Sequence, residues 1–355
     1  MPGKKKVCII GAGNISNTRH IPAVCKNKNI EIVGLVSNEL NNLTRTQNKY
    51  KFIKNSLLID PKKDVIFQLN STQWFGEVDA VIIGTPPKEH YEISKICLQL
   101  KKHVLVEKPM AMDINQCDDM IEIANNNRVT LNVMHSFNYA DGISEMDKRF
   151  RNNEFGELRS ILEVQLTNRD RRLPKWYNDL PLGLFFDEAA HFFYTAMRFG
   201  NGNYSVLNAH AHYGLPKENT PQHLEIQGMV GEIPVQTYMN FNSPVCEWII
   251  MLICAKKIAI YDFFKDILIV ADNDKQHLAV DVLRSSMQYT FGYWRGFIIN
   301  GFKMVTHRLL YGHDKIISEF MENIETKKDS TYISAEMGKK VIIAMNKVVN
   351  LAESF

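Results

Sequence analysis

Short apolar runs alternate with amphipathic stretches along the first third of the chain. The runs are rich in valine and isoleucine and predict strands, whereas the stretches between them have helical periodicity. The expected strands lie near residues 6–10, 30–38, 78–84, 103–107 and 129–134, and the expected helices at 16–26, 39–51, 91–101 and 114–125. Apolar strands that alternate with helices are typical of a parallel sheet covered on both faces. The pattern therefore predicts a doubly wound α/β domain over residues 1–138.

From about residue 139 a series of strands replaces this alternation. The strand candidates lie at 158–168, 205–214, 223–230, 235–242, 248–264 and 266–273, and Gly, Pro, Asn and Asp separate them. Such a series favours an antiparallel sheet. Two amphipathic helices, 315–328 and 334–354, are expected to close the chain. A second domain of the α+β class is therefore predicted for residues 139–355.

Composition narrows the class of protein. The 355 residues are 45% hydrophobic and 23% charged, as in an ordinary globular protein with room for two cores. A formal charge of +3 is too small for a nucleic-acid-binding surface. The six cysteines form no C-x-x-C pair, which favours free thiols in a reducing compartment. Because no apolar run has the length of a membrane span and no signal peptide is recognised, we expect a cytoplasmic protein.

The first expected strand ends in the glycine turn "GAGNIS", which leads into a helix. Gly11 permits the tight turn, and Gly13 lets the backbone approach a pyrophosphate that faces the helix N-terminus. Asn14 and Ile15 continue the turn, and Ser16 is small enough to keep helix and strand close. The turn therefore predicts a dinucleotide site.

Polar residues also follow the ends of later strands. They are Ser37 and Asn38, then Thr85, Pro86 and His90, then Glu107, Lys108 and Pro109. Ligands of parallel sheets bind where the carboxyl ends of the strands meet, so we expect these residues to bind a dinucleotide; a crevice without a ligand is the alternative. The second strand ends without the acid that would hold the ribose of NAD, and no arginine follows directly. NAD and NADP therefore both remain candidates.

The segment "LGLFFDEAAHFFY" places Asp187 and His191 four residues apart within an apolar run. On a helix they would lie one turn apart on the same face. A buried ion pair is one interpretation. The other is an acid/base pair, because histidine exchanges a proton near neutral pH and a carboxylate can orient it.

Lys108 stands in "VLVEKP" at the end of a buried strand, where a nicotinamide ring is expected. By itself EKP would indicate a surface Lys–Glu pair. Taken together, however, four motifs resemble the family of glucose–fructose oxidoreductase, inositol dehydrogenase and MocA-like oxidoreductases. The motifs are GAGNIS, GTPPKEH, EKP and the D-x-x-x-H that runs from Asp187 to His191, and they have the order and spacing of that family.

The resemblance implies a Rossmann domain followed by a domain with an open, mostly antiparallel sheet, through which many members form dimers or tetramers. It implies NAD(P)-dependent chemistry at a hydroxyl of a sugar, a sugar derivative or a cyclitol. It also implies that Lys108 binds the reacting oxygen, that His191 accepts the proton and that Asp187 is its acidic neighbour. Glu107, Thr85, Pro86 and His90 would line the nicotinamide side. Ala189 and Asn138 depart from the glycine and arginine that are frequent in the family, which leaves substrate orientation open.

A loop with basic and aromatic residues precedes Asp187. Arg171, Arg172 and Lys175 could bind a phosphate or carboxylate of the substrate. Trp176 or Tyr177 could stack on a sugar ring. A solvated loop with aromatic anchors is an equal alternative.

Two histidines, His210 and His212, share one face of an expected strand. No cysteine or acid accompanies them at the spacing of metal ligands. We therefore expect them to be polar surface residues and expect no metal site.

The segment Tyr289–His313 combines aromatic residues with cations, and there is no acid between Asp281 and Asp314. Its apolar stripe comprises Ile298, Phe302, Val305 and Leu309. Such a stripe usually packs on a sheet or on a neighbouring subunit. Peripheral binding to a membrane or to a lipid-linked sugar is the alternative.

The function favoured by these features is NAD(P)-dependent hydride transfer at a hydroxyl or keto carbon of a sugar, nucleotide sugar or cyclitol. One alternative is the same chemistry on a small non-sugar carbonyl compound or diol. Another is a dinucleotide-binding scaffold or sensor without turnover. The combination of Lys108, Asp187 and His191 argues against the scaffold, since a scaffold has no need of these three side chains.

Overall fold

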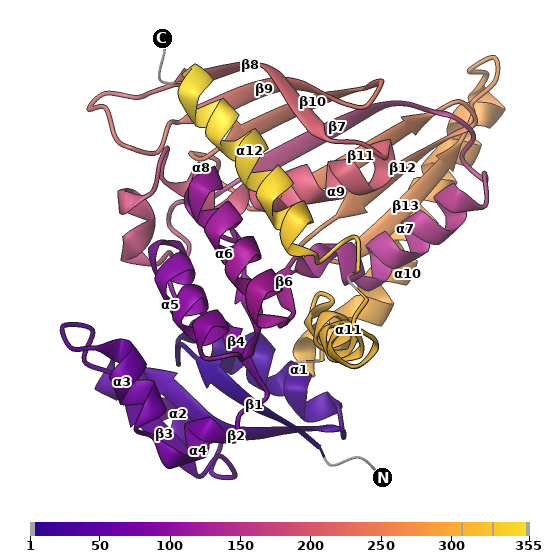
Figure 1. Cartoon of the computed structure of the whole chain (residues 1–355). Coiled ribbons are helices and arrows are strands. Elements are labelled where there is room, and N and C mark those ends of the chain that lie inside the picture. Colours follow the sequence, from indigo (N-terminus) through magenta and orange to yellow (C-terminus); the bar gives the residue numbers. More distant parts are fainter. Residues whose placement is uncertain (1–3, 307, 329, 353–355) are drawn as a thin grey trace. The chain divides into compact units, whose positions relative to one another are not determined.

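The computed structural model describes residues 4–306, 308–328 and 330–352, and Figure 1 shows their helices and strands. They group into two compact units. Unit 1 comprises the chain up to His135 together with His313–Ile342, and unit 2 comprises Ser136–Gly312 and the chain from Ile343. The predicted domain limits, 1–138 and 139–355, stay a prediction.

A six-stranded parallel sheet forms the centre of unit 1. The strands have the order β3-β2-β1-β4-β5-β6 and the bounds β1 Lys5–Ile10, β2 Ile30–Ser37, β3 Asn55–Leu58, β4 Ala80–Ile83, β5 His103–Glu107 and β6 Leu131–Met134. The order reverses between β1 and β4, which is the switch point of dinucleotide-binding sheets. Residues 7–10, 80–83 and 104–106 are at most 3% exposed, which explains why these runs are apolar throughout.

Helices connect and cover the strands of this sheet, and Figure 1 shows α5 beside α6. The helical elements are η1 Ser16–His20, α1 Ile21–Lys26, α2 Leu40–Lys49, α3 Val65–Asn70, α4 Gln73–Gly76, α5 Pro87–Gln99, α6 Ile114–Asn127 and α11 His313–Thr326. Helix α12, Ala335–Ala352, begins in unit 1 and ends in unit 2. Helix α5 begins four residues before the predicted start, because Pro87 has the φ angle that suits a first helical turn. His90 therefore lies within the first turn of α5.

Unit 2 contains a seven-stranded sheet of order β13-β12-β11-β7-β10-β9-β8. Its strands are β7 Leu158–Leu166, β8 Tyr204–His212, β9 His223–Val230, β10 Ile233–Asn240, β11 Glu247–Cys254, β12 Lys257–Asp262 and β13 Ile267–Asp272. Only β7 and β10 pair in parallel among the neighbours of this sheet, so the predicted fold class is confirmed. The run predicted as 248–264 is two strands, since the chain turns between Cys254 and Lys257.

The helical elements of unit 2 are η2 Ser136–Tyr139, α7 Asp141–Arg151, η3 Lys175–Asp179, α8 Leu184–Glu188, α9 Ala190–Gly200 and α10 Ala279–Val305. Helix α9 packs on β7, β8 and β9, and eight of its residues from Ala190 to Met197 are buried. Over the described ranges, no helix combines the length and apolarity that crossing a membrane requires.

Helix α10 packs on β13 of the sheet, as predicted, but the apolar stripe is not the side that meets the strand, and packing on a neighbouring subunit stays a prediction. Ile298 and Phe302 are each 66% exposed and Val305 is 81% exposed. The helix ends at Val305, so Leu309 lies beyond it, where it is buried. His307 belongs to the same predicted segment and lies outside the described residues.

Candidate cofactor and substrate sites

The two glycines after β1 occupy different environments. Gly11 has a φ angle of +94°, and a Cβ atom there would lie 2.6 Å from the backbone oxygen of Gly84. A Cβ atom on Gly13 would meet nothing within 4 Å. The Ser16 hydroxyl donates a hydrogen bond of 2.5 Å to the Gly11 carbonyl and fastens the following helix to the turn. The turn therefore brings a bare backbone next to open space, which is what a bound pyrophosphate needs.

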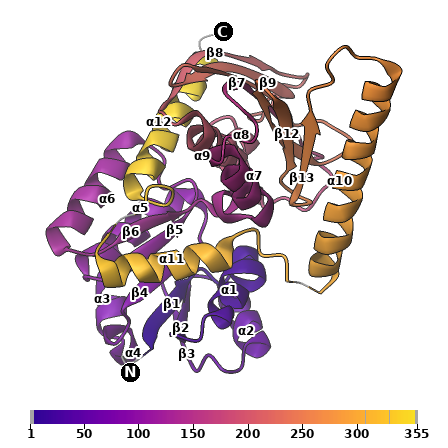
Figure 2. The same cartoon turned by 90° about the vertical axis from the view of Figure 1, so that its right-hand side faces the viewer.

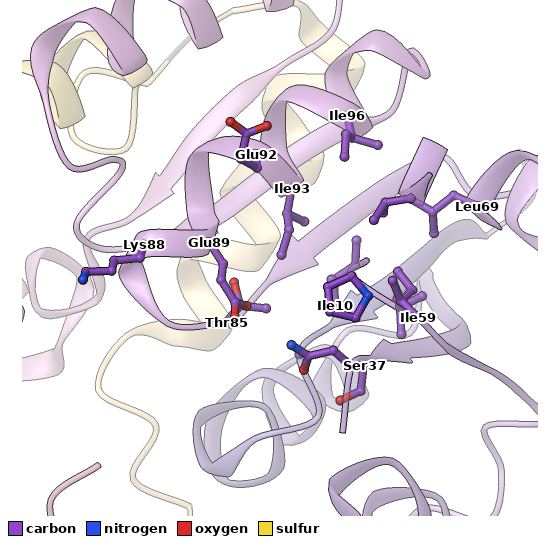
Figure 3. A pocket seen from close by; sticks show the side chains of 15 residues that line it. Ile10, Ser37, Ile59, Leu69, Thr85, Lys88, Glu89, Glu92, Ile93 and Ile96 are labelled. Atoms are coloured by element: carbon purple, nitrogen blue, oxygen red, sulfur yellow. The ribbon is translucent and has the colours of Figure 1, made fainter. Parts of the chain in front are cut away.

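A cavity of about 280 Å³ lies in unit 1 at the carboxyl ends of β1, β2 and β4 (Figure 3). Four residues that the sequence predicts for the cofactor line it: Gly11, Ser37, Asn38 and Thr85. Apolar side chains such as Ile59 and Ile93 form much of the remaining wall. The Thr85 hydroxyl is buried and has no hydrogen-bond partner in the described part of the chain. An apolar cavity with a few unsatisfied polar groups fits the adenosine end of a dinucleotide.

Three charged residues of α5, which the sequence does not predict for the cofactor, also line this cavity. They are Lys88, Glu89 and Glu92, and Figure 3 shows them along one helix. Burial raises the pKa of Glu89, and the negative charge of Glu39 adds to this effect. Their place directly after the "GTPP" loop was the available signal, because a helix that starts at the end of β4 must border the crevice.

His90 connects the loops that follow β4 and β5. Its ring is fully buried, with Nδ1 2.7 Å from the Pro109 carbonyl oxygen and Nε2 2.8 Å from the Thr85 carbonyl oxygen. Burial lowers the pKa of His90, which favours the neutral ring. A neutral ring donates through one nitrogen only, so it bonds one of the two carbonyls at a time. His90 thus holds the two loops together and does not line the cavity.

Glu107 lies at the end of β5 among histidines from distant parts of unit 1. Its Oε1 atom is 2.8 Å from His20 Nε2 and 3.7 Å from His313 Nε2, and its Oε2 atom accepts a bond of 3.2 Å from the Lys108 backbone N–H. Burial alone would raise the pKa of Glu107, but the hydrogen bonds with His20 and His313 hold it well below its usual range. Burial lowers the pKa of His20 despite its acidic partner. We therefore assign an ionised Glu107 that accepts a hydrogen bond from a neutral His20.

The same three residues have the donor set of a metal site. One potential ligand atom from each of His20, Glu107 and His313 lies within 4.8 Å of the others. The direct hydrogen bond between His20 and Glu107 satisfies both side chains without a metal ion. Neither histidine was singled out from the sequence, because no local pattern relates residues 20, 107 and 313.

Lys108 follows Glu107 and is joined to Pro109 by a cis peptide bond. It belongs to unit 1, as do the predicted cofactor residues Gly13, Asn14, Ile15 and Pro86. Gly13 contributes to the turn described above, and Asn14 and Ile15 form the start of the helix. These residues do not line the cavity of Figure 3.

In unit 2, Asp187 and His191 lie on two consecutive helices. Helix α8 ends at Glu188, and α9 begins at Ala190. His191 is buried, and its Nδ1 atom is 2.6 Å from the Tyr194 hydroxyl. That hydroxyl also accepts a hydrogen bond of 3.1 Å from the Phe137 backbone N–H. Tyr194, which no sequence motif indicated, therefore orients the His191 ring.

Aromatic side chains enclose the His191 ring. The ring centroid is 4.8 Å from that of Phe137 in an edge-on contact and 5.7 Å from that of Trp248. Such packing fixes the direction of the imidazole, which a general acid or base requires.

Arg171, a predicted substrate residue, forms an ion pair with Glu188. The Glu188 carboxylate is buried and also accepts hydrogen bonds from the side chains of Gln165 (2.5 Å) and Thr167 (3.1 Å). Burial lowers the pKa of Arg171, and the charge of Asp187 opposes this effect. The Arg171 Nε atom is nevertheless buried without a hydrogen-bond partner in the described ranges. Arg171 is thus anchored to the protein and retains one unsatisfied donor.

The other predicted substrate residues lie on or next to η3. Arg172 is exposed, whereas Trp176 and Tyr177 are partly exposed. Asn138, which departs from the arginine frequent in the family, is 1% exposed. Both polar atoms of its side chain lack a hydrogen-bond partner among the residues that the structure describes. An unsatisfied buried amide of this kind is a candidate for contact with a ligand.

The comparisons with known proteins agree with this geometry. Residues 5–135 match the family model described as an oxidoreductase family with an NAD-binding Rossmann fold. A 1-carboxy-3-chloro-3,4-dihydroxycyclohexa-1,5-diene dehydrogenase from Comamonas testosteroni is 35% identical over 118 residues, which are 32% of this chain and 30% of that protein. The glucose-6-phosphate 3-dehydrogenase of Bacillus subtilis (strain 168) is 30% identical over 157 residues, which are 44% of this chain and 41% of that protein. The aligned regions thus span less than half of either relative.

The likeness in structure extends over the whole chain. The 3-ketoreductase KijD10 from Actinomadura kijaniata, solved with TDP-benzene and NADP, superposes with a TM-score of 0.75 at 15% identity. The superposition covers 99% of this chain and 98% of that one. The two proteins therefore share their fold.

Proposed function

Residues 5–135 belong to the glucose–fructose oxidoreductase, inositol dehydrogenase and MocA-like family, and from this premise we propose that the chain is an NAD(P)-dependent oxidoreductase. It would transfer a hydride to or from a hydroxyl or keto carbon of a sugar, nucleotide sugar or cyclitol. The observation that carries the proposal is the turn at Gly11 and Gly13, which adjoins open space beside the unsatisfied hydroxyl of Thr85. Two relatives, a sugar-phosphate dehydrogenase and a cyclic diol dehydrogenase, support the substrate class.

The cofactor would be held by the residues at the carboxyl ends of the parallel strands. The turn from Gly11 to Ile15 would bind the pyrophosphate, and Ser37, Asn38 and Thr85 would contact the adenosine end. A nicotinamide, when bound, accepts or supplies a hydride. Glu107, itself fixed by His20, would position the backbone at Lys108 near that ring.

Lys108 and His191 would act on the same carbinol. The Lys108 ammonium would donate a hydrogen bond to the reacting oxygen and stabilise negative charge on it. His191 would accept the hydroxyl proton during oxidation and return it during reduction. Tyr194 would hold the ring, and the carboxylate of Asp187 would stabilise its charged form.

The substrate would be oriented by side chains of unit 2. Arg172 would meet a phosphate or carboxylate, and Trp176 or Tyr177 would stack on a ring. Arg171 would contribute its unsatisfied Nε donor while Glu188 holds the rest of the guanidinium group.

Copies of the chain would associate through the sheet of unit 2, in the cytoplasm. Along β11, partly exposed Ile249, Met251 and Ile253 alternate with buried residues, so the face opposite the core carries an apolar strip. An exposed apolar strip of this kind is typical of a surface that contacts another protein chain. Sedimentation velocity should detect a dimer or tetramer, and a monomer at all concentrations would refute this part of the proposal.

The function is tested by incubating the full chain with a panel of sugars, nucleotide sugars and cyclitols, each with NAD and with NADP. Absorbance of the reduced nicotinamide should rise with at least one substrate and cofactor. Keto sugars with reduced cofactor test the opposite direction. Turnover confined to small non-sugar carbonyls would change the substrate class. Tight cofactor binding without turnover across the panel would favour a scaffold or sensor.

A further inference from the structure

Helix α10 is attached to unit 2 by its small and polar side. It runs along β13 over 27 residues (Figure 2). A Cβ atom on Gly296 would lie 2.8 Å from Ile267, and one on Gly292 would lie 3.6 Å from Ile269. The Asn300 side chain donates a hydrogen bond of 2.5 Å to the Asp266 carbonyl. Small residues thus let the helix approach the strand, which orients the rest of its surface outward.

The outward surface of α10 consists of large apolar side chains. Ile298, Phe291 and Leu283 are more than 60% exposed, and Trp294 and Phe297 are more than 50% exposed. Further exposed members of this surface are Val280, Met287, Phe302, Met304 and Val305. A helix on a globular protein ordinarily buries its apolar side and exposes its polar side. Helix α10 has the opposite arrangement, so its outward surface fits an apolar environment.

The charges next to this surface are positive. Arg295 is exposed, Arg284 is partly exposed, and Arg308 follows the end of the helix. No acidic residue occurs between Asp281 and Asp314. Asp281 accepts a hydrogen bond from the Leu278 backbone N–H and thereby caps the start of the helix. Arg284 forms an ion pair of 3.6 Å with Asp281, whereas Arg295 and Arg308 lie in a stretch, residues 282–313, that contains no acid.

We propose that α10 binds the surface of a membrane that contains anionic lipids, with its outward side chains inserted among the acyl chains. Helices that lie in a membrane interface combine Trp, Phe and Leu on one side with Lys or Arg on the other. Trp294 and Tyr293 would lie at the headgroup level, which aromatic rings with a polar edge prefer. Arg295 and Arg308 would reach the lipid phosphates.

A second copy of the chain is a poorer occupant of this surface. A two-fold contact places the same patch of both copies together. Such a contact would enclose the exposed Arg295 beside the apolar side chains, and residues 282–313 offer no acid to pair with it. An anionic membrane satisfies both the apolar side chains and the arginines.

The test is co-sedimentation of the full chain with unilamellar vesicles of phosphatidylcholine, with and without phosphatidylglycerol. The chain should bind the anionic vesicles at low salt and be released at about 1 M salt, where charges are screened within roughly 3 Å. Trp294→Ser combined with Phe297→Ser, and separately Arg295→Glu, should each lower the bound fraction at least about 10-fold. The matched controls are Phe67→Ser, at a phenylalanine of unit 1 that is 68% exposed, and Lys62→Glu, at an exposed lysine. Both should bind like the unchanged chain.

A spectroscopic measurement keeps the proposal testable if a variant folds poorly. Brominated lipids should quench tryptophan fluorescence of the unchanged chain, and Trp294→Phe, which keeps an apolar aromatic side chain, should abolish most of that quenching while binding persists. The proposal is overturned if the unchanged chain does not bind anionic vesicles. It is also overturned if the double variant binds them equally well, or if that variant instead dissociates an oligomer of a chain that does not bind vesicles.

Discussion

Two glycines of one turn are required for different physical reasons. At Gly11 the requirement belongs to the fold, since its positive φ angle and the nearby Gly84 oxygen exclude a side chain. At Gly13 nothing in the protein opposes a side chain. A glycine there suits the proposed pyrophosphate, because a side chain would occupy the same open space.

This difference predicts opposite phenotypes for two substitutions. Gly13→Val should weaken dinucleotide binding about 100-fold, a loss of roughly 3 kcal/mol, with unchanged stability. Gly11→Ala should instead lower the free energy of unfolding by about 1–3 kcal/mol because of its backbone strain. Fluorescence titration with the reduced dinucleotide and urea denaturation would measure the two effects. A destabilised Gly13→Val variant would contradict the assignment of that space to the cofactor.

The proposed acid/base residues make a second prediction for single residues. Lys108→Ala and His191→Asn should each lower kcat by about 10²–10⁴-fold, which is the usual contribution of such groups. The dissociation constant of the cofactor should change little in either variant. His210→Asn, on β8, serves as the matched control and should retain full turnover. Normal kcat in the Lys108 and His191 variants would remove both residues from the mechanism.

At the scale of the elements, the paired strands β7 and β10 enclose a buried acid. Glu163 on β7 is fully buried, and its Oε2 atom accepts a hydrogen bond of 2.6 Å from the Thr237 hydroxyl on β10. Burial raises the pKa of Glu163 to about 8, although the bond from Thr237 opposes the change. The other carboxyl oxygen has no partner in the described part of the chain. This pair of strands therefore holds a protonated carboxyl group at neutral pH.

Glu163→Gln should consequently stabilise unit 2 at high pH. Because the folded pKa is raised, the stabilisation by the protonated acid is complete below the unfolded value of 4.5 and is lost as the pH rises through 8. The free energy of unfolding falls by about 1.4 kcal/mol for each pH unit between 4.5 and 8. The variant should raise the free energy of unfolding at pH 8 by about 2–5 kcal/mol and leave it unchanged near pH 4. Glu225→Gln, at an exposed acid of β9, is the control, and an equal gain there would contradict the argument.

At the scale of the whole molecule, we expect the stability of the two units to respond to pH in opposite directions. Unit 1 contains buried histidines that must remain neutral: burial lowers the pKa of His135 to about 4 and also lowers the pKa of His20 and His90. A lowered folded pKa means that this stability is complete above the unfolded value of 6.5 and is lost as the pH falls toward 4. Unit 2, in contrast, loses stability as the pH rises, because the buried Glu163 must then lose its proton.

Calorimetry over a pH series should therefore show two transitions that move apart. Between pH 7 and pH 5 the midpoint temperature of the unfolding of unit 1 should fall, while the protonated Glu163 stabilises unit 2. His135→Asn should reduce the acid dependence of unit 1 by about 1.4 kcal/mol per pH unit. Glu163→Gln identifies the transition of unit 2, because it should shift that transition alone at pH 8. A unit 1 transition that is independent of pH from 7 to 4.5 would refute the prediction.

The sequence by itself determined the fold class and indicated four residues that line the cavity of unit 1. Both follow from local patterns: apolar strands that alternate with helices require a covered parallel sheet, and a glycine turn after β1 requires a ligand near the backbone. Gly11, Ser37, Asn38 and Thr85 accordingly meet at one cavity. The four motifs also indicated the family whose model matches residues 5–135.

Only the tertiary structure decided which side chains are partners. Glu107 bonds to His20, 87 residues away in the chain, and Arg171 pairs with Glu188, because distant segments meet in the packed fold. It likewise decided the direction of α10: periodicity identifies an apolar stripe, but the glycines that fit against β13 turn that stripe outward. Hydrophobic periodicity states which residues share a face, whereas the contacts of the neighbouring element decide whether that face is buried.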